Sequence, residues 1–86
     1  MPKNSRPDDI TKWSTDDVCD WLTEEGFGVQ SGLFREQEID GGSLLLMKRM
    51  DVLTELNLKL GPAVKIYEKI KKIQNDGSIW KYDDCF

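Results

Sequence analysis

Apolar side chains recur at helical spacing in the segment that follows the first tryptophan, Trp13. Three of them fall on one helical face: Val18, Trp21 and Leu22. Ser14 and Asp17 have the spacing of a capping box, and the tryptophan before them can pack onto the first turn as a hydrophobic staple. The pattern predicts a helix over residues 15–25 that stops at Gly26.

Shorter apolar patterns predict three short helices in the middle of the chain. The first spans about residues 30–38 and the last about residues 49–56. Between them, Asp40 can cap a very short helix, and Gly41-Gly42 lets the backbone turn closely before it. The inward side chains of these helices are expected to be Leu33, Phe34, Leu44, Leu45, Val52, Leu53 and Leu56.

The last helix has the longest apolar stripe in the chain: Ala63, Ile66, Tyr67, Ile70 and Ile73. Gly61 is a tolerated N-cap, and Pro62 suits the first helical position because its missing N–H would have no acceptor there. The helix is expected to run to Gln74 or Asn75 and to end before Gly77.

Five helices joined by short turns predict an all-α fold, a compact five-helix bundle with a long C-terminal helix. Residues 10–75 form the expected domain. Residues 1–9 contain two prolines and no apolar pattern, so they are interpreted as a disordered lead-in. Residues 76–86 form a separate acidic and aromatic tail.

The composition excludes most catalytic sites. The 86 residues include no histidine, and Cys19 and Cys85 are too few for a thiolate metal cage. Adjacent acids such as Asp16-Asp17 and Asp83-Asp84 are explained more simply as helix caps or solvated charges. We therefore expect no enzyme activity, no metal, no cofactor and no small-molecule substrate.

The hydropathy pattern predicts a chain outside the membrane. The longest apolar run, Leu44 to Met47, has four residues, and the N-terminus lacks an apolar signal segment. Two isolated cysteines are typical of a reducing compartment, so the expected location is the cytosol or the nucleus.

Charge is distributed unevenly along the chain, whose net charge is −4. Residues 8–57 contain twelve acids and four bases, whereas residues 58–75 contain five lysines and one acid. An acidic body and a basic terminal helix could attract a second copy, or could simply be two solvated faces.

Three parts of the chain together resemble a known family: Trp13 with Val18 and Trp21-Leu22, then FREQEIDGGSLLLM, then VLTELNLKLGPAVKIYEKIKKIQ. They resemble the sterile alpha motif (SAM) domain over about residues 10–75, and within it the Polycomb-group and malignant-brain-tumour-repeat subset. The resemblance implies a protein interaction module that pairs head to tail with itself or with other SAM domains. It also implies a nuclear location, with the cytoplasm as the alternative.

The resemblance also implies two unlike binding surfaces. The end-helix surface surrounds the start of the last helix and comprises Lys59, Leu60, Gly61, Pro62, Lys65 and Lys69. The mid-loop surface is acidic with an apolar floor and comprises Glu36, Glu38, Asp40, Leu46, Met47, Met50, Asp51 and Glu55. Lys48 and Met50 depart from the family pattern, in which a small polar or acidic residue is common at that point.

Several alternatives remain open at this stage. Leu60 is the expected apolar anchor of the end-helix surface, but it could instead pack inward onto the last helix. The domain could polymerise, or it could pair only with a different SAM domain. Binding of RNA through Lys59, Lys65 and Lys69 is disfavoured because the chain is acidic and that helix lacks exposed aromatic residues between its lysines.

Overall fold

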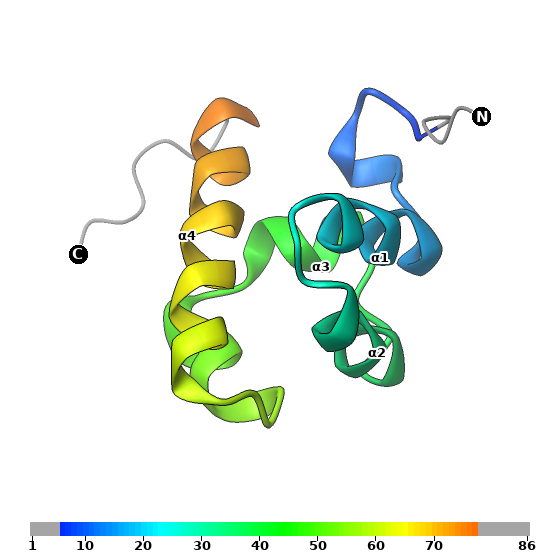
Figure 1. Ribbon diagram of the computed structural model, residues 1–86. Coiled ribbons are helices and arrows are strands. Elements are labelled where there is room, and N and C mark those ends of the chain that lie inside the picture. The colour runs from blue at the N-terminus through cyan, green and yellow to red at the C-terminus, as the bar shows by residue number, and fades with distance from the viewer. Residues whose placement is uncertain (1–5, 78–86) are drawn as a thin grey trace.

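A computed structural model describes residues 6–77 of the chain. Its elements, in order, are the 3₁₀ helix η1 (Ile10–Lys12), α1 (Thr15–Glu24), α2 (Gly28–Glu36), α3 (Gly41–Leu46), the π-helical turn η2 (Asp51–Glu55) and α4 (Leu60–Gly77). Figure 1 shows α4 on one side of the molecule, α1 and α2 on the other, and α3 between them. Every regular element among these residues is helical, which confirms the all-α prediction.

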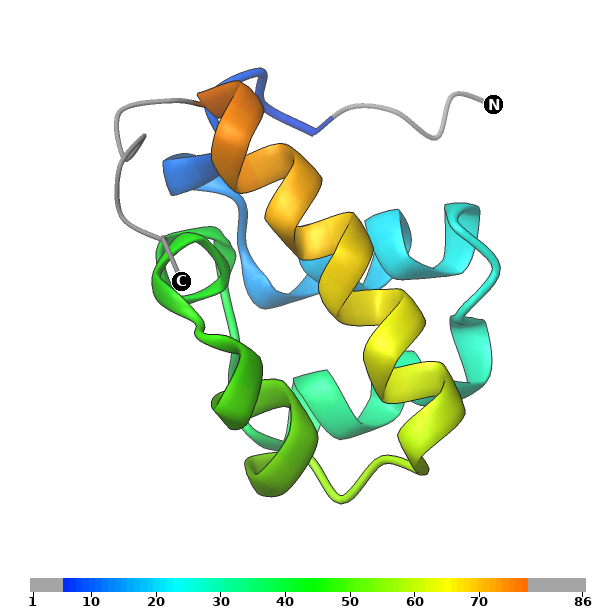
Figure 2. The same ribbon diagram turned by 90° about the vertical axis from the view of Figure 1, so that its left-hand side faces the viewer.

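The core lies where α4 crosses the shorter helices (Figure 2). Its fully buried large side chains are Phe34, Leu22, Leu44, Leu56, Ile66, Ile70, Val18 and Val52. Most of the expected inward positions are therefore confirmed, whereas Leu33, Leu45 and Leu53 are only half-buried. Ile39, which the sequence pattern did not single out, is also buried.

The capping box at the start of α1 is confirmed. The Ser14 hydroxyl accepts a hydrogen bond from the Asp17 N–H at 3.1 Å, and the Asp17 carboxylate accepts one from the Ser14 N–H at 2.9 Å. The helix ends at Glu24, one residue earlier than expected. Gly26 then adopts a φ of +97°, a conformation that glycine takes without a steric penalty.

Helix α2 begins two residues earlier than predicted and ends two residues earlier. The Phe27 carbonyl accepts the Ser31 N–H at 3.0 Å, so Gly28 is the first helical residue and not part of a turn. At the other end, Glu38 has a left-handed φ of 57°, which breaks the helix before residue 38.

The predicted short helix over residues 49–56 is present: residues 49–50 are α-helical, and η2 continues them as a π-helical turn. The Thr54 hydroxyl donates a 2.7 Å hydrogen bond to the Met50 carbonyl. The Thr23 hydroxyl makes the same kind of bond to the Cys19 carbonyl inside α1, which stays α-helical, so this bond alone does not set the π-helical geometry. Asn57, with a φ of 58°, then turns the chain toward α4.

Helix α4 starts at Leu60 and continues through Gly77, so both predicted ends were wrong. The Ala63 N–H bonds the Lys59 carbonyl at 3.0 Å, which makes Lys59 the N-cap in place of Gly61. Pro62 is consequently the third helical residue. It still removes no helical hydrogen bond, because the first four N–H groups of a helix have no intrahelical acceptor.

The segment before η1 is ordered by contacts with α1, whereas the sequence assigned residues 6–9 to a disordered lead-in. The Arg6 guanidinium forms two hydrogen bonds with the Glu24 carboxylate and lies 5.1 Å from the centroid of the Trp13 ring. The indole N–H of Trp13 donates to the Pro7 carbonyl at 2.8 Å, and Asp9 caps η1. Trp13, whose ring is buried and whose indole N–H is a hydrogen-bond donor, thus holds this segment in place.

The expectations for residues 1–5 and 78–86 lie outside the described residues, and these include Cys85 and the aromatic side chains of the tail. Within residues 6–77, no helix is both long and apolar enough to cross a bilayer.

Candidate interaction surfaces

Leu60 points outward at the start of α4. Its side chain is 69% exposed, which decides between the two orientations that the sequence left open. Helix α4 instead turns its core face inward through Ala63, Ile66 and Ile70. An exposed leucine in the first turn of the longest helix is therefore available to a partner.

Lys59, which directly precedes Leu60, and Lys65, five residues after it, are both exposed. Because the N–H groups of a helix start carry partial positive charge, the two ammonium groups add to a region that is already positive. Lys69 differs from them. Its Nζ lies 3.2 Å from the Glu25 carboxylate at the end of α1, so it is engaged within the chain.

Four of the eight predicted mid-loop residues line one open depression of about 400 Å³. They are Leu46, Met47, Asp51 and Glu55. Ile39 and Leu56 add apolar atoms, whereas Gln37 and Ser43 add polar ones. Leu46 is 64% exposed, so apolar surface and carboxylates meet at the same place. This combination suits an apolar side chain surrounded by cations.

Two of the predicted mid-loop carboxylates have structural partners. Asp40 accepts the Ser43 N–H at 3.0 Å and caps α3, and this bond lowers the pKa of its carboxyl group. Asp51 accepts the Lys48 N–H at 2.9 Å. These bonds to backbone N–H groups use part of the hydrogen-bonding capacity of both carboxylates. Glu55 is the remaining carboxylate of the depression, and it forms no hydrogen bond or ion pair with residues 6–77.

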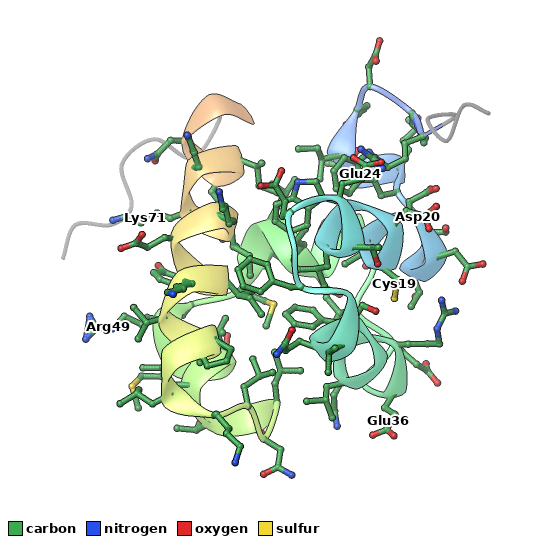
Figure 3. The ribbon with its side chains drawn as sticks, in the orientation of Figure 1. Cys19, Asp20, Glu24, Glu36, Arg49 and Lys71 are labelled. Carbon is green, nitrogen blue, oxygen red and sulfur yellow. The ribbon has the colours of Figure 1, made fainter. Side chains whose placement is uncertain are left out.

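The remaining predicted mid-loop residues do not line the depression. Glu36 ends α2 and projects away from the molecule in Figure 3, and Glu38 occupies the left-handed turn that follows. Met50 is 60% exposed before η2. The sequence also gave no sign of Gln74, whose side-chain amide donates to the carbonyls of Leu44 and Met47 and so closes the end of α3 beside the depression.

Comparison with protein families places these surfaces in context. The family model of the SAM domain (sterile alpha motif) matches residues 11–74. The chain belongs to the SAM domain family.

Similar proteins and structures support the expected resemblance to the Polycomb-group subset. The human Sterile alpha motif domain-containing protein 13 is 55% identical over 73 residues, which is 84% of this chain and 60% of that protein. The human Sterile alpha motif domain-containing protein 1 is 51% identical over 75 residues, or 87% of this chain and 14% of that protein. This SAM domain therefore spans less than two thirds of either relative.

Two solved structures share the fold. The Polyhomeotic SAM domain superposes with a TM-score of 0.68 at 40% identity, covering 80% of this chain and 99% of that one. A chain from the Scm-SAM and Sfmbt-SAM heterodimer gives a TM-score of 0.70 at 29% identity, covering 77% and 94%. The second of these structures is a heterodimer of two SAM domains.

Proposed function

We propose that this SAM domain associates head to tail with a second copy, the end-helix surface of one copy binding the mid-loop surface of the next. The observation that carries the proposal is the outward Leu60 at the start of α4, a region that also exposes Lys59 and Lys65, matched by an apolar depression that bears Glu55. Because the two surfaces differ, each bound copy leaves one surface open. Repetition of such a contact builds a ring or an open helical filament.

The apolar anchor supplies more of the affinity than any single ion pair. Burying a leucine side chain contributes about 1.5–3 kcal/mol. An exposed lysine–carboxylate pair contributes about 0.2–1 kcal/mol, so the lysines mainly set orientation and encounter rate. Asp51 and Asp40 already accept hydrogen bonds from backbone N–H groups, which limits the number of strong pairs. The association is expected to weaken at high salt because exposed charges are screened over about 10 Å at 0.1 M.

The first experiment is sedimentation velocity over a concentration series with Leu60→Arg. This variant places a cation against a basic surface and removes the anchor, so the large species formed by the native chain should disappear. Val29→Arg is the matched control, since Val29 is 89% exposed on α2 and lies on neither surface. Large species that persist in Leu60→Arg, or that vanish equally in Val29→Arg, would contradict the assignment.

A mixing experiment tests whether the contact is head to tail. Leu60→Arg blocks one surface and Glu55→Arg blocks the other, so each variant alone should sediment as a monomer. An equimolar mixture retains one intact surface from each partner and should form a dimer with no larger species. A symmetric contact would instead leave the mixture monomeric, because both copies would then carry a damaged surface.

Pairing with a different SAM domain is the second candidate. It is supported by the Scm-SAM and Sfmbt-SAM heterodimer and by a second similar structure, the hetero SAM domain structure of Ph and Scm. In that case the native chain stays monomeric alone and binds only when another SAM domain is added. The similarity to the Polyhomeotic SAM domain also supports a place in a nuclear, chromatin-associated scaffold, which localisation of the tagged full chain would test.

A further inference from the structure

Helix α4 carries a second stripe of apolar side chains beside the one that faces the core. Leu60, Val64 and Tyr67 lie on it and Lys71 follows them, so successive positions are four, three and four residues apart. This is the spacing at which one helix packs against another. Leu60 is 69% exposed and Val64 is 45% exposed, so the stripe is open to a partner.

The stripe forms one wall of a groove of about 380 Å³, and residues 49–53 form the other. Leu53 adds apolar surface on that opposite wall. No residue between 6 and 77 fills the groove. The stripe extends eleven residues from Leu60 to Lys71, which is about 17 Å along the helix axis or about three helical turns. A partner helix of this length is long enough to contact the whole stripe.

The polar groups of the groove favour a partner that carries carboxylates. The side chains of Arg49 and Lys71 line it, and neither forms an ion pair with any residue between 6 and 77. The Tyr67 hydroxyl likewise makes no hydrogen bond within that part of the chain. Figure 3 shows Arg49 and Lys71 projecting from the same side of the molecule. Among the described residues that line the groove, Glu68 is the one acid, so the cations are in excess.

A second copy of this domain does not supply a matching helix from its described residues. The large apolar side chains that residues 6–77 expose are Val29, Leu46, Met50, Leu60 and Val64, and α4 is the only helix among them that carries two. Pairing of two α4 stripes would bring two cations and one acid from each copy together, which is repulsive. An acidic helix of a different protein therefore matches the stripe and its cations better.

We propose that the groove between α4 and residues 49–53 binds an acidic amphipathic helix of a partner protein. The apolar face of that helix lies on Leu60, Val64 and Tyr67, and its flanking carboxylates pair with Arg49 and Lys71. The contact forms on a single copy and does not require self-association. Because Leu60 also belongs to the end-helix surface, a bound helix excludes the next copy from that surface, a consequence that rests on the proposed function.

A peptide titration on the full chain tests the proposal. The probe is a capped peptide of about 18 residues with leucines at alternating four- and three-residue spacing, glutamates beside them and alanines elsewhere. The chain carries Glu55→Arg, which blocks the mid-loop surface and leaves the groove intact. The peptide should shift the backbone amide signals of residues 49–53 and 60–71 and leave those of α2 unchanged. Fluorescence anisotropy of the labelled peptide measures the dissociation constant.

Matched variants separate the apolar contact from the charged one. Val64→Asp should weaken peptide binding by about tenfold or more, because it places a carboxylate in the apolar stripe. Val29→Asp makes the same change at an exposed valine of α2 and should leave the affinity unchanged. Arg49→Glu should weaken binding of the glutamate peptide and strengthen binding of a peptide with lysines in place of the glutamates.

Several results would overturn the proposal. They are the absence of shifts at about 1 mM peptide, shifts centred outside the groove, and equal binding of a peptide with the same composition and scrambled leucine spacing. A dimer of the Glu55→Arg chain that Val64→Asp abolishes would assign the groove to a second copy and would equally overturn it. Failure of the native chain to self-associate would contradict the head-to-tail contact alone, because the titration uses a chain that is monomeric in either case.

Discussion

Gly41 is the position where a single added methyl group should damage the fold most directly. A Cβ atom built on Gly41 would lie 1.7 Å from the Ile10 carbonyl oxygen and 2.8 Å from the Cβ of Trp13. The Gly41 N–H also donates to the Trp13 carbonyl at 3.0 Å. The start of α3 is therefore pressed against η1 by backbone on both sides, and Gly41→Ala must push the two elements apart by more than about 1 Å to reach ordinary contact distances.

The neighbouring glycine provides a control of the same chemistry. A Cβ atom on Gly42 meets only the Asp40 carboxylate oxygen, at 3.8 Å, which is ordinary contact. Both substitutions gain the helix preference of alanine, about 0.8–1.0 kcal/mol at most, so this gain cancels between them. Two costs of Gly41→Ala do not cancel: overpacking against Ile10 and Trp13, and strain in the backbone hydrogen bond from Gly41 to Trp13. Together they should make Gly41→Ala about 2–4 kcal/mol less stable than Gly42→Ala.

Thermal unfolding followed by circular dichroism measures the difference. For a domain of this size, about 2–4 kcal/mol corresponds to a gap of about 10 °C or more between the two midpoints. Gly42→Ala should match or exceed the native midpoint. Equal midpoints for the two variants would refute the reasoning, because they would show that η1 can move away from α3 at little cost.

Two further predictions concern single side chains. The hydrogen bond from the Ser43 N–H lowers the pKa of the Asp40 carboxyl group in the folded protein. The ionised cap therefore stabilises the fold fully above pH 3.8, the ordinary pKa of an aspartate. This stabilisation is lost as the pH falls through the lower pKa of the folded state. Urea unfolding at neutral pH and below pH 3.8 measures how much of the free energy of unfolding each protein loses on acidification. Asp40→Asn should lose less than the native chain, because its amide oxygen caps α3 without titrating. An equal loss in the two proteins would contradict this role of Asp40. Arg6→Ala should lower the free energy of unfolding by about 1 kcal/mol, since it removes an exposed ion pair and a cation–π contact. Arg6→Lys should recover part of this in the same thermal assay, whereas an unchanged midpoint in Arg6→Ala would show that the segment before η1 contributes nothing.

The fold could be predicted from the sequence where local chemistry and burial agree. Ser14 and Asp17 form the expected capping box, and Asp40 caps α3 as expected. Helix boundaries were missed where the backbone conformation of a single residue decides them. Glu38 adopts a left-handed φ of 57° after α2, and the Lys59 carbonyl accepts the Ala63 N–H and so starts α4 before Gly61. Neither feature is visible as periodicity, because each concerns one backbone position and not the spacing of apolar side chains.

The surfaces were less predictable than the fold because a charged residue can serve either a helix end or a partner. The carboxylates of Asp40 and Asp51 both bond backbone N–H groups. Lys69 is paired with Glu25 in the same chain. From the sequence alone, Asp40, Asp51 and Lys69 were all assigned to binding surfaces.

Subtracting these groups leaves few charges for any contact between copies, chiefly Lys59 and Lys65 on one surface and Glu55 on the other. An interface with so few exposed pairs must draw most of its affinity from apolar contact, which makes Leu60 its dominant group. Salt should consequently slow the encounter of two copies more than it weakens their final contact, whereas covering Leu60 should abolish the final contact.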